Sequence, residues 1–209
     1  MPKSKQASDQ TAQKGAYHHG DLRAALLQAA EAELNDKNIE SLSLRGVAKR
    51  AGVSHAAPAH HFGDKSGLLT ALAIIGFQRL TEAQTSRSKL TGTEDEAFVA
   101  KGHGYVAFAT ANPALFDLMF GSQQPDYADA DLLHAANQAI APLVESIAHR
   151  ASGSPFGGGD PTHKLVAAWA LVHGFAGLIN HGKLRWVDDL EGGSEALVNA
   201  VLTNELSKR

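Results

Sequence analysis

The chain has 209 residues, a formal net charge of −3 and no cysteine. Without cysteine it has no disulfide, no zinc–thiolate cluster and no thiol nucleophile. Its length allows one large domain or two small ones, each with a buried core. The first residues lack the apolar core of a secretory signal, and no stretch approaches the ~18 consecutive apolar residues of a membrane helix. We therefore expect a cytoplasmic protein with no membrane partner.

The charge is distributed unevenly along the chain. Residues 1–65 contain nine Lys/Arg and seven Asp/Glu, whereas the remaining residues contain ten and fifteen. Five of the eleven histidines also lie in the first part. This asymmetry suggests a small part that faces a polyanion, carried on a larger acidic body. Residues 1–15 are polar and carry three lysines, so we expect a disordered basic arm there.

The N-terminal part has the periodicity and capping signals of four helices. Asp21 can cap the first, which ends at "NDKN". Ser43 can cap a short second helix, and Gly52 is placed for the left-handed conformation that stops it. Ser54 can cap the third helix and Asp64 a long fourth helix, which runs to the segment "TGTEDE".

Helical periodicity continues to the end of the chain. We expect a helix over about 97–110, broken by Asn112-Pro113, and a short one over "ALFDLMF". Pro142 is expected to kink or divide the next helix, "DLLHAANQAIAPLVESIAHR". Two more helices follow the loop "ASGSPFGGGDP". With no strand pattern, the sequence predicts an all-α fold of about nine helices: a helix-turn-helix domain at 16–65 and a ligand-binding and dimerisation domain at 66–209.

The second and third helices, joined at Gly52, form a helix-turn-helix pattern. Pro58 falls in the first turn of the third helix, where its missing N–H is tolerated. The side chains expected to be exposed there are small or polar: His55, Ala56, Ala57, Ala59, His60 and His61. Such a helix fits a major groove, because histidine can donate to bases or phosphates and alanine can contact a thymine methyl.

The spacing of these histidines does not favour a metal site. They are adjacent pairs or lack a carboxylate partner at helical spacing, whereas metal-binding pairs on helices favour spacings of three or four. We therefore expect no metal and no cofactor. An inert surface is the alternative to DNA contact for His55 and His60, and packing against Phe62 is the alternative for His61.

The segment "LRGVAKRAGVSHAAPAHHFGDKSGLL", preceded by "YHHGDLRAALLQAA", resembles the DNA-binding domain of the TetR (tetracycline repressor) family over about residues 17–75. The resemblance implies an all-α homodimer that binds double-stranded DNA at a palindromic operator and releases it when a small-molecule effector binds. It also implies phosphate contacts from Lys65, at the start of the fourth helix, and from Ser43 and Arg45. The expected DNA-binding residues are Ser43, Arg45, Ser54, His55, Ala56, Ala57, His60, His61 and Lys65. One position departs from the family: Ala59 stands where a phosphate-binding tyrosine is common.

"WALVHGFAGLINHG" and "NPALFDLMFG" resemble the tryptophan–histidine–glycine type of C-terminal domain found in one branch of the same family, through Trp169, His173 and Gly174. We expect a pocket for an apolar or amphipathic effector, lined by Phe108, Phe116, Met119, Phe120, Trp169 and His173. The alternative for the aromatic cluster and for His173 is an ordinary place in the core.

Small side chains recur along one face of the helix that carries Trp169. Ala170, Gly174, Gly177 and His181 are spaced by four, three and four residues, so another helix can approach closely there. Leu197 and Val201 of the last helix can complete a four-helix dimer interface, as the family implies. The opposite face, which includes Trp169 and Val172, is expected to point into the core.

The sequence thus predicts a ligand-responsive transcriptional repressor and not an enzyme. No nucleophile elbow, metal-ligand spacing or glycine-rich phosphate loop after a strand is present. The alternatives are a hydrolase-like protein and a helical adaptor that has lost DNA binding.

Overall fold

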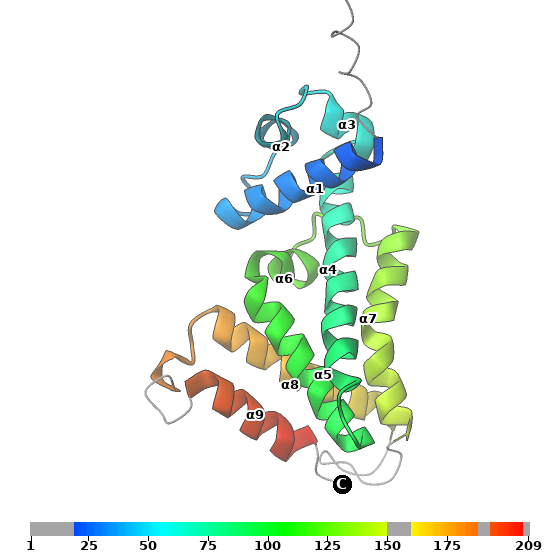
Figure 1. Cartoon of the computed structure of the whole chain (residues 1–209), viewed down its shortest axis with the longest axis vertical. Helices are drawn as coiled ribbons and strands as arrows, with labels where there is room; N and C mark the ends of the chain where they lie inside the picture. Colours follow the sequence, from blue (N-terminus) through cyan, green and yellow to red (C-terminus); the bar gives the residue numbers. More distant parts are fainter. Residues whose placement is uncertain (1–18, 150–159, 188–192, 207–209) are drawn as a thin grey trace, which may run out of the picture.

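The computed structural model describes residues 19–149, 160–187 and 193–206, and in these ranges the chain forms nine α-helices and one short 3₁₀-helix, as expected for an all-α protein (Figure 1). The helices are α1 (His19–Asp36), α2 (Leu44–Ala51), α3 (Ala57–Phe62), α4 (Lys65–Ser88), α5 (Glu94–Ala111), α6 (Pro113–Phe120), α7 (Ala130–His149), α8 (Pro161–Asn180) and α9 (Gly193–Leu206), with the 3₁₀-helix η1 at Arg185–Val187. The proposed basic arm at 1–15 lies outside the described residues.

The helices α1, α2 and α3 form a unit at one end of the molecule (Figure 1). The Ser43 hydroxyl accepts the N–H of Gly46 and caps α2, which confirms that prediction. Gly52 ends α2 with φ 68°, a conformation that suits glycine, so its predicted role is also confirmed. Asp21 lies inside α1 because the helix already includes His19, so the cap expected at Asp21 was wrong.

The expected cap of α3 was also wrong. The helix begins at Ala57, and its N-cap is Ala56, which makes no side-chain hydrogen bond. A serine cap at position 54 would need the N–H of Ala57, but that N–H donates to the carbonyl of Ser54 instead, at 3.0 Å. Residues 54–56 therefore form a turn, and Pro58 occupies the second position of a shorter helix.

A buried carboxylate ties α2 to α1. The Glu33 side chain is 7% exposed and accepts hydrogen bonds from Lys37 and Arg50, and Arg50 also donates to Asp36. The hydrogen bond from Lys37 and then that from Arg50 hold the pKa of Glu33 below its usual value. Because two cations satisfy this carboxylate, it can be buried without the penalty of an unpaired charge.

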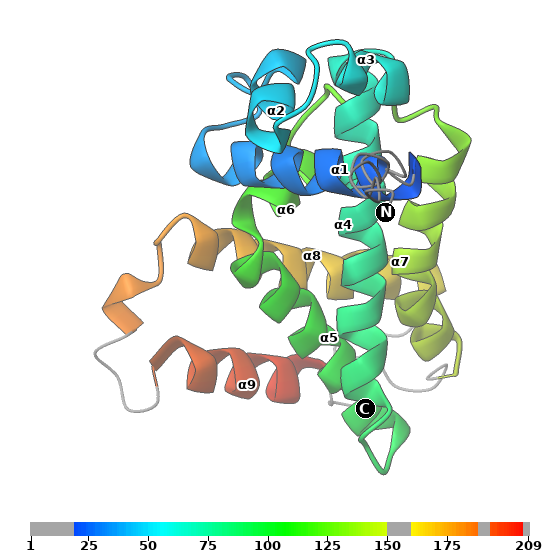
Figure 2. The same ribbon diagram turned by 45° about the horizontal axis from the view of Figure 1, so that its top comes forward.

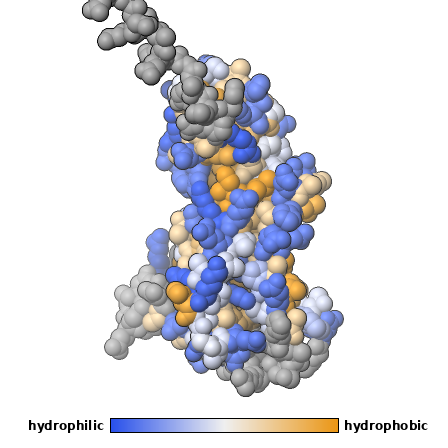
Figure 3. Space-filling model, turned by 45° about the vertical axis from the view of Figure 1, so that its right-hand side comes forward, coloured by the Kyte–Doolittle hydropathy of each residue, from blue (hydrophilic) through white to orange (hydrophobic). Residues whose placement is uncertain are grey.

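The longest described helix, α4, joins the two ends of the molecule. Asp64 caps it by accepting the N–H of Gly67, as predicted. The helix packs against α1 near one end and against α5 and α7 over the rest of its length (Figure 1). Arg79 also forms two hydrogen bonds with Glu31 of α1. In Figure 3, apolar residues reach the surface at the waist between the N-terminal unit and the body, and polar residues cover most of the remaining visible face.

Two boundaries in the C-terminal part differ from the prediction. A capping box between Thr93 and Glu96 starts α5 at Glu94 rather than at Ala97, so the acidic residues before Ala97 form its first turn. The helix α7 continues through Pro142, so the division was wrong. The proline removes one intrahelical hydrogen bond, and the packing of α7 on α4 and α5 keeps both halves in one helix.

The helix α8 crosses α5 and also contacts α7, and α9 packs against α5 next to α8 (Figures 1 and 2). Val172 and Ala176 of α8 and Leu202 of α9 are buried against the body. The hydrophobic core joins α4, α5, α6 and α7 to α1 and α2 at one end, and α8 and α9 close one side of it.

Candidate functional site

The helix α3 stands at the outer end of the molecule (Figure 2). Its inner side is fixed by the buried ring of Pro58 and by Phe62, whose ring lies 5.3 Å below the guanidinium of Arg23. His55, Ala56, Ala59 and His60 are exposed, as is Ser54, and Ala57 and His61 are half-buried. The arrangement leaves a small, polar and protruding tip.

Basic side chains surround this tip. Arg45 and Lys49 of α2 are exposed. Lys65 is the first residue of α4, and its ammonium donates to the carbonyl of Glu40 at 3.0 Å. An ammonium has three protons to donate, so Lys65 retains donors for a phosphate. The Ser43 hydroxyl accepts from Gly46 and can still donate its own proton.

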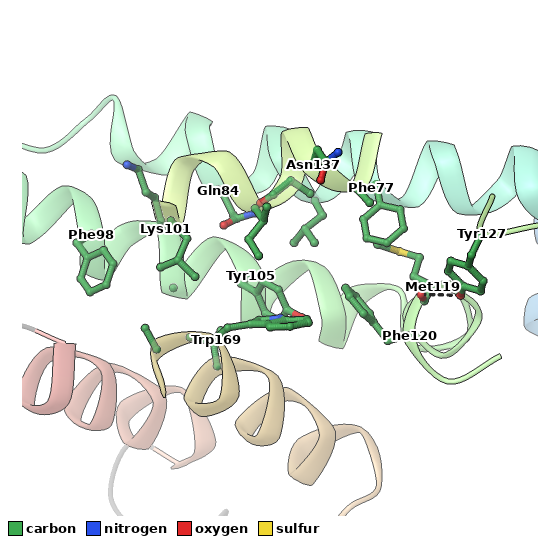
Figure 4. A pocket seen from close by; sticks show the side chains of 18 residues that line it. Phe77, Gln84, Phe98, Lys101, Tyr105, Met119, Phe120, Tyr127, Asn137 and Trp169 are labelled. Atoms are coloured by element: carbon green, nitrogen blue, oxygen red, sulfur yellow. Dashed lines mark hydrogen bonds between the residues drawn. The ribbon is translucent and has the colours of Figure 1, made fainter. Parts of the chain in front are cut away.

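A cavity of about 310 Å³ lies between α4, α5 and α7, and α6 and α8 close it (Figure 4). It is lined by Phe77, Leu80, Gln84, Phe98, Lys101, Gly102, Tyr105, Met119, Phe120, Tyr127, Ala136, Asn137, Ala139, Ile140, Leu143, Ala168, Trp169 and Val172. Asn137, Tyr127 and Trp169 are exposed at its rim. Its size and mostly apolar walls are typical of small-molecule sites.

A chain of hydrogen bonds fixes one wall of the cavity. The indole N–H of Trp169 can only donate, and it lies 3.3 Å from the Tyr105 hydroxyl oxygen. That hydroxyl lies 2.8 Å from Nδ1 of His173 and can donate its proton there when the imidazole is neutral with its proton on Nε2. Burial lowers the pKa of His173 and raises the pKa of Tyr105, so both groups keep these uncharged forms.

Gln84 and Lys101 supply the polar groups at the opposite end of the cavity from Met119 and Tyr127 (Figure 4). The amide N–H of Gln84, which is 5% exposed, donates to the carbonyl of Ala139 at 3.0 Å. The ammonium of Lys101 donates to the carbonyl of Pro142 and to the Ser146 hydroxyl, at 3.1 and 2.6 Å. Both side chains therefore link the cavity wall to α7.

One face of α8 has no partner within the described part of the chain. A Cβ added at Gly174 or Gly177 would meet no atom within 4 Å, and Ala170 and His181 are exposed on the same face. Leu197 and Val201 of α9 are half-buried. By length and composition α8 could also cross a membrane, with a window of mean hydropathy 1.2, of which 22% is buried. One such helix is weak evidence of a membrane span, because a core helix of a soluble protein passes the same test.

Two family descriptions match the chain. Residues 26–72 match bacterial regulatory proteins of the tetR family, and residues 98–201 match the tetracyclin repressor-like C-terminal domain. The chain belongs to the TetR family of transcriptional regulators. TetR proteins are regulators and not enzymes, which excludes the hydrolase-like alternative.

The similarity extends over the whole TetR fold. A protein of unknown function from Rhodococcus sp. RHA1 is 34% identical, with a TM-score of 0.76 over 92% of this chain and 97% of that one. The regulator BetI of Yersinia pestis is 39% identical over 61 residues, which are 29% of this chain and 31% of BetI. AibR, solved with isovaleryl coenzyme A and operator DNA, has the same fold, at 18% identity and a TM-score of 0.65 over 90% of this chain and 99% of that one. The matched segment thus spans about a third of the length of BetI.

Three of the six residues predicted for the ligand pocket of this TetR protein line the cavity: Met119, Phe120 and Trp169. Phe108, Phe116 and His173 do not. Phe108 is buried elsewhere in the core, and Phe116 lies behind the lining, with its ring centroid 5.0 Å from that of His173. Trp169, expected to point into the core, is 37% exposed because it sits at the rim.

The sequence reasoning did not find Gln84, Lys101, Tyr105, Tyr127 or Lys49. Tyr105 and Lys101 are four residues apart on one face of α5, a spacing that could have signalled a shared surface. Gln84 lies in the polar last part of α4, "TEAQTSRS", so the sequence around it gave no signal of a site. Among the described residues no three His, Asp or Glu side chains are grouped so as to hold a metal ion.

Proposed function

We propose that this chain is a homodimeric, ligand-responsive transcriptional repressor, located in the cytoplasm, that leaves a palindromic operator when a small apolar or amphipathic effector binds. The observation that carries the proposal is the position of α4. It begins at Lys65 beside the protruding α3, and Phe77, Leu80 and Gln84 of the same helix line the cavity. At 1.5 Å per residue, Lys65 and Gln84 are about 29 Å apart along one rigid helix.

At the DNA-binding end, α3 is the element that enters the major groove in this proposal. Its exposed His55 and His60 supply donors to base edges, and Ala56 and Ala57 can contact thymine methyl groups. Ser43, Arg45 and Lys65 are proposed to contact phosphates, with Ser54 and His61 at the edge of the contact. The side chain of Ala59 cannot donate a hydrogen bond to a phosphate. We therefore propose that Lys49, which is exposed on α2, is a further cation that contacts the DNA backbone.

A second connection supports the coupling between the cavity and the DNA-binding end. The hydroxyl of Tyr127, at the cavity rim, donates to the carbonyl oxygen of Met119 at 2.9 Å, and the carbonyl oxygen of Ser122 lies within reach as an alternative acceptor at 3.1 Å. The loop that follows α6 then reaches α4, because Ser66 donates to the carbonyl of Gln124 and the N–H of Asp126 donates to Thr70, both at 2.8 Å.

The same loop touches the N-terminal unit directly. The amide of Gln124 donates to the carboxylate of Glu40, whose carbonyl accepts from Lys65. An effector that displaces Met119 or Tyr127 would therefore move both this loop and the start of α4. The effector binds the DNA-bound and the released conformation with different affinities. This difference sets the free energy that couples effector binding to DNA release, typically about 1–3 kcal/mol.

The unpartnered face of α8 supports the homodimer. Val166 and Leu178 are large apolar residues of α8 with 54% and 44% exposure. Ala170, Gly174, Gly177 and His181 would let a second α8 approach closely, and Leu197 and Val201 of α9 would flank it. Such a pair of helices from each subunit would place two α3 helices about 34–36 Å apart, one turn of DNA.

The experiment is a binding titration against DNA at several salt concentrations. A preferred sequence is selected from genomic fragments and labelled, and binding is followed by fluorescence anisotropy. The logarithm of affinity falls with the logarithm of salt by about 0.9 for each neutralised phosphate. We expect Lys65→Ala to reduce the slope by about one per subunit on every sequence. Lys89→Ala, at the other end of α4, is the matched control and should leave it unchanged.

Two results would contradict the proposal. One is the absence of any DNA sequence bound more tightly than random fragments. The other is a salt slope that Lys65→Ala and Lys89→Ala change equally, which would remove Lys65 from the interface. A helical adaptor without DNA binding would give the first result.

A further inference from the structure

The polar end of the cavity has binding groups that the chain itself leaves unused. The inference drawn from them rests on the proposed function, because it names the class of effector for the same cavity. It depends on Lys101 and Gln84, which come from neighbouring helices and lie next to each other along the cavity (Figure 4).

The ammonium of Lys101 has no anionic partner within the described part of the chain. Its two hydrogen-bond acceptors are neutral, a carbonyl and a hydroxyl, and no salt bridge of the described residues includes it. The side chain is half-buried. One of its three protons remains for a further acceptor. A partly desolvated cation of this kind favours an anionic group in the cavity.

The side-chain oxygen of Gln84 has no donor. The amide orientation follows from the partner, since only the nitrogen can bond to the carbonyl of Ala139. No described residue donates to Oε1, although Gln84 is 5% exposed and lines the cavity. An unsatisfied buried acceptor costs about 1–3 kcal/mol, so a ligand that donates there gains affinity.

Apart from Tyr105, Tyr127 and Asn137, the remainder of the cavity lining is mostly apolar. Phe77, Met119 and Phe120 lie at the end away from Lys101 (Figure 4). The volume of about 310 Å³ is about ten times the roughly 30 Å³ that one water molecule occupies in the liquid, so a ligand of about ten non-hydrogen atoms fits. This size matches an acid with a short to medium alkyl chain.

We infer that the cavity binds a medium-chain hydroxy carboxylate. Its carboxylate accepts a hydrogen bond from Lys101, its hydroxyl donates to Gln84 Oε1, and its alkyl chain lies among Phe77, Met119 and Phe120. No group of the chain fills these roles in the described residues, and the three chemical features match the three parts of the wall.

The test uses four ligands of nearly equal size on the full-length protein without DNA. 3-Hydroxyoctanoate carries both groups, octanoate lacks the hydroxyl, 3-hydroxyoctanamide lacks the charge, and octanamide lacks both. Affinities are measured by isothermal titration calorimetry. We expect 3-hydroxyoctanoate to bind about tenfold to a hundredfold more tightly than its amide and about threefold to tenfold more tightly than octanoate.

Substitutions at two positions assign the preferences to residues. Lys101→Met keeps the length of the side chain and should abolish the preference for acid over amide, while Lys101→Arg should retain it. Gln84→Met should abolish the preference for the hydroxyl and leave the preference for acid. Thermal unfolding of each variant without ligand shows whether it is folded, and the series on the unsubstituted protein stands without any variant.

The inference is overturned if the amide binds as tightly as the acid, if no member of the series binds at millimolar concentration, or if Lys101→Met leaves the acid preference intact. The DNA titration separates this failure from that of the proposed function. Operator binding without affinity for any of the four ligands refutes only the ligand class. If the protein shows the expected ligand preferences but binds no DNA sequence preferentially, only its proposed function as a regulator is refuted.

Discussion

The crossing of α4 and α5 gives a sharp test of the packing. A Cβ added at Gly104 of α5 would lie 2.3 Å from the carbonyl oxygen of Ala83 and 2.8 Å from Cα of Gln84. Both atoms belong to the backbone of α4 and cannot rotate away. Non-bonded atoms pack at about 3.5 Å, so the two helices would have to separate by about 1 Å to accept alanine.

Gly76 of α4 provides the matched control. A Cβ added there would lie 2.4 Å from the sulfur and 3.0 Å from Cγ of Met119. These atoms end a flexible side chain that can change rotamer. Alanine in place of glycine inside a helix adds about 1 kcal/mol of stability at either position, because it restricts the unfolded chain. The two substitutions therefore differ mainly in what the new methyl group meets.

We expect Gly104→Ala to lower the free energy of unfolding by about 1–2 kcal/mol, because overpacking against a backbone costs about 1–3 kcal/mol and outweighs the gain in helix propensity. The melting temperature should fall by about 2–8 °C. Gly76→Ala should change the free energy of unfolding by less than about 1 kcal/mol. Urea and thermal unfolding measure both, at one protein concentration because subunit association adds to stability. A Gly104→Ala protein as stable as the unsubstituted one, or a larger loss from Gly76→Ala, would refute the reasoning.

Two further predictions concern α8. Gly174→Leu should leave the fold intact, because a Cβ there meets no atom within 4 Å, but sedimentation at micromolar concentration should show a monomer in place of the dimer. Gly92→Leu, in the loop before α5, is the control and should remain a dimer. If Gly174→Leu also remains a dimer, the interface lies elsewhere. His173, whose pKa is lowered by burial, should make the protein less stable as pH falls below about 6.5, because the unfolded chain then takes up a proton that the folded chain refuses. In thermal unfolding, the loss of stability between about pH 7.5 and pH 5.5 should be smaller for His173→Asn than for the unsubstituted protein. His163→Asn, at an exposed position of the same helix, is the control and should lose as much stability as the unsubstituted protein. Equal losses in all three proteins would contradict this role of His173.

Local chemistry was enough to place much of the fold from the sequence. A helix end depends on a few neighbouring residues, so the caps at Ser43 and Asp64 and the left-handed Gly52 could be assigned from the residue pattern alone. The same approach failed at Ser54, where the backbone carbonyl competes with the hydroxyl for one N–H. The choice between these two acceptors depends on how the turn is held against Pro58 and Phe62.

The cavity depended on tertiary structure. Helical periodicity shows which face of a helix is apolar, but not which faces of other helices it meets or where packing leaves a space. For this reason Phe108 and Phe116 were as plausible as Met119 and Phe120, and Gln84 gave no signal. The amino-acid sequence by itself determined an all-α fold with a helix-turn-helix pattern, because helix periodicity and helix ends are set by local spacing. Only the packing of α4, α5 and α7 decided which polar groups face the cavity, because residues distant in the sequence become neighbours there.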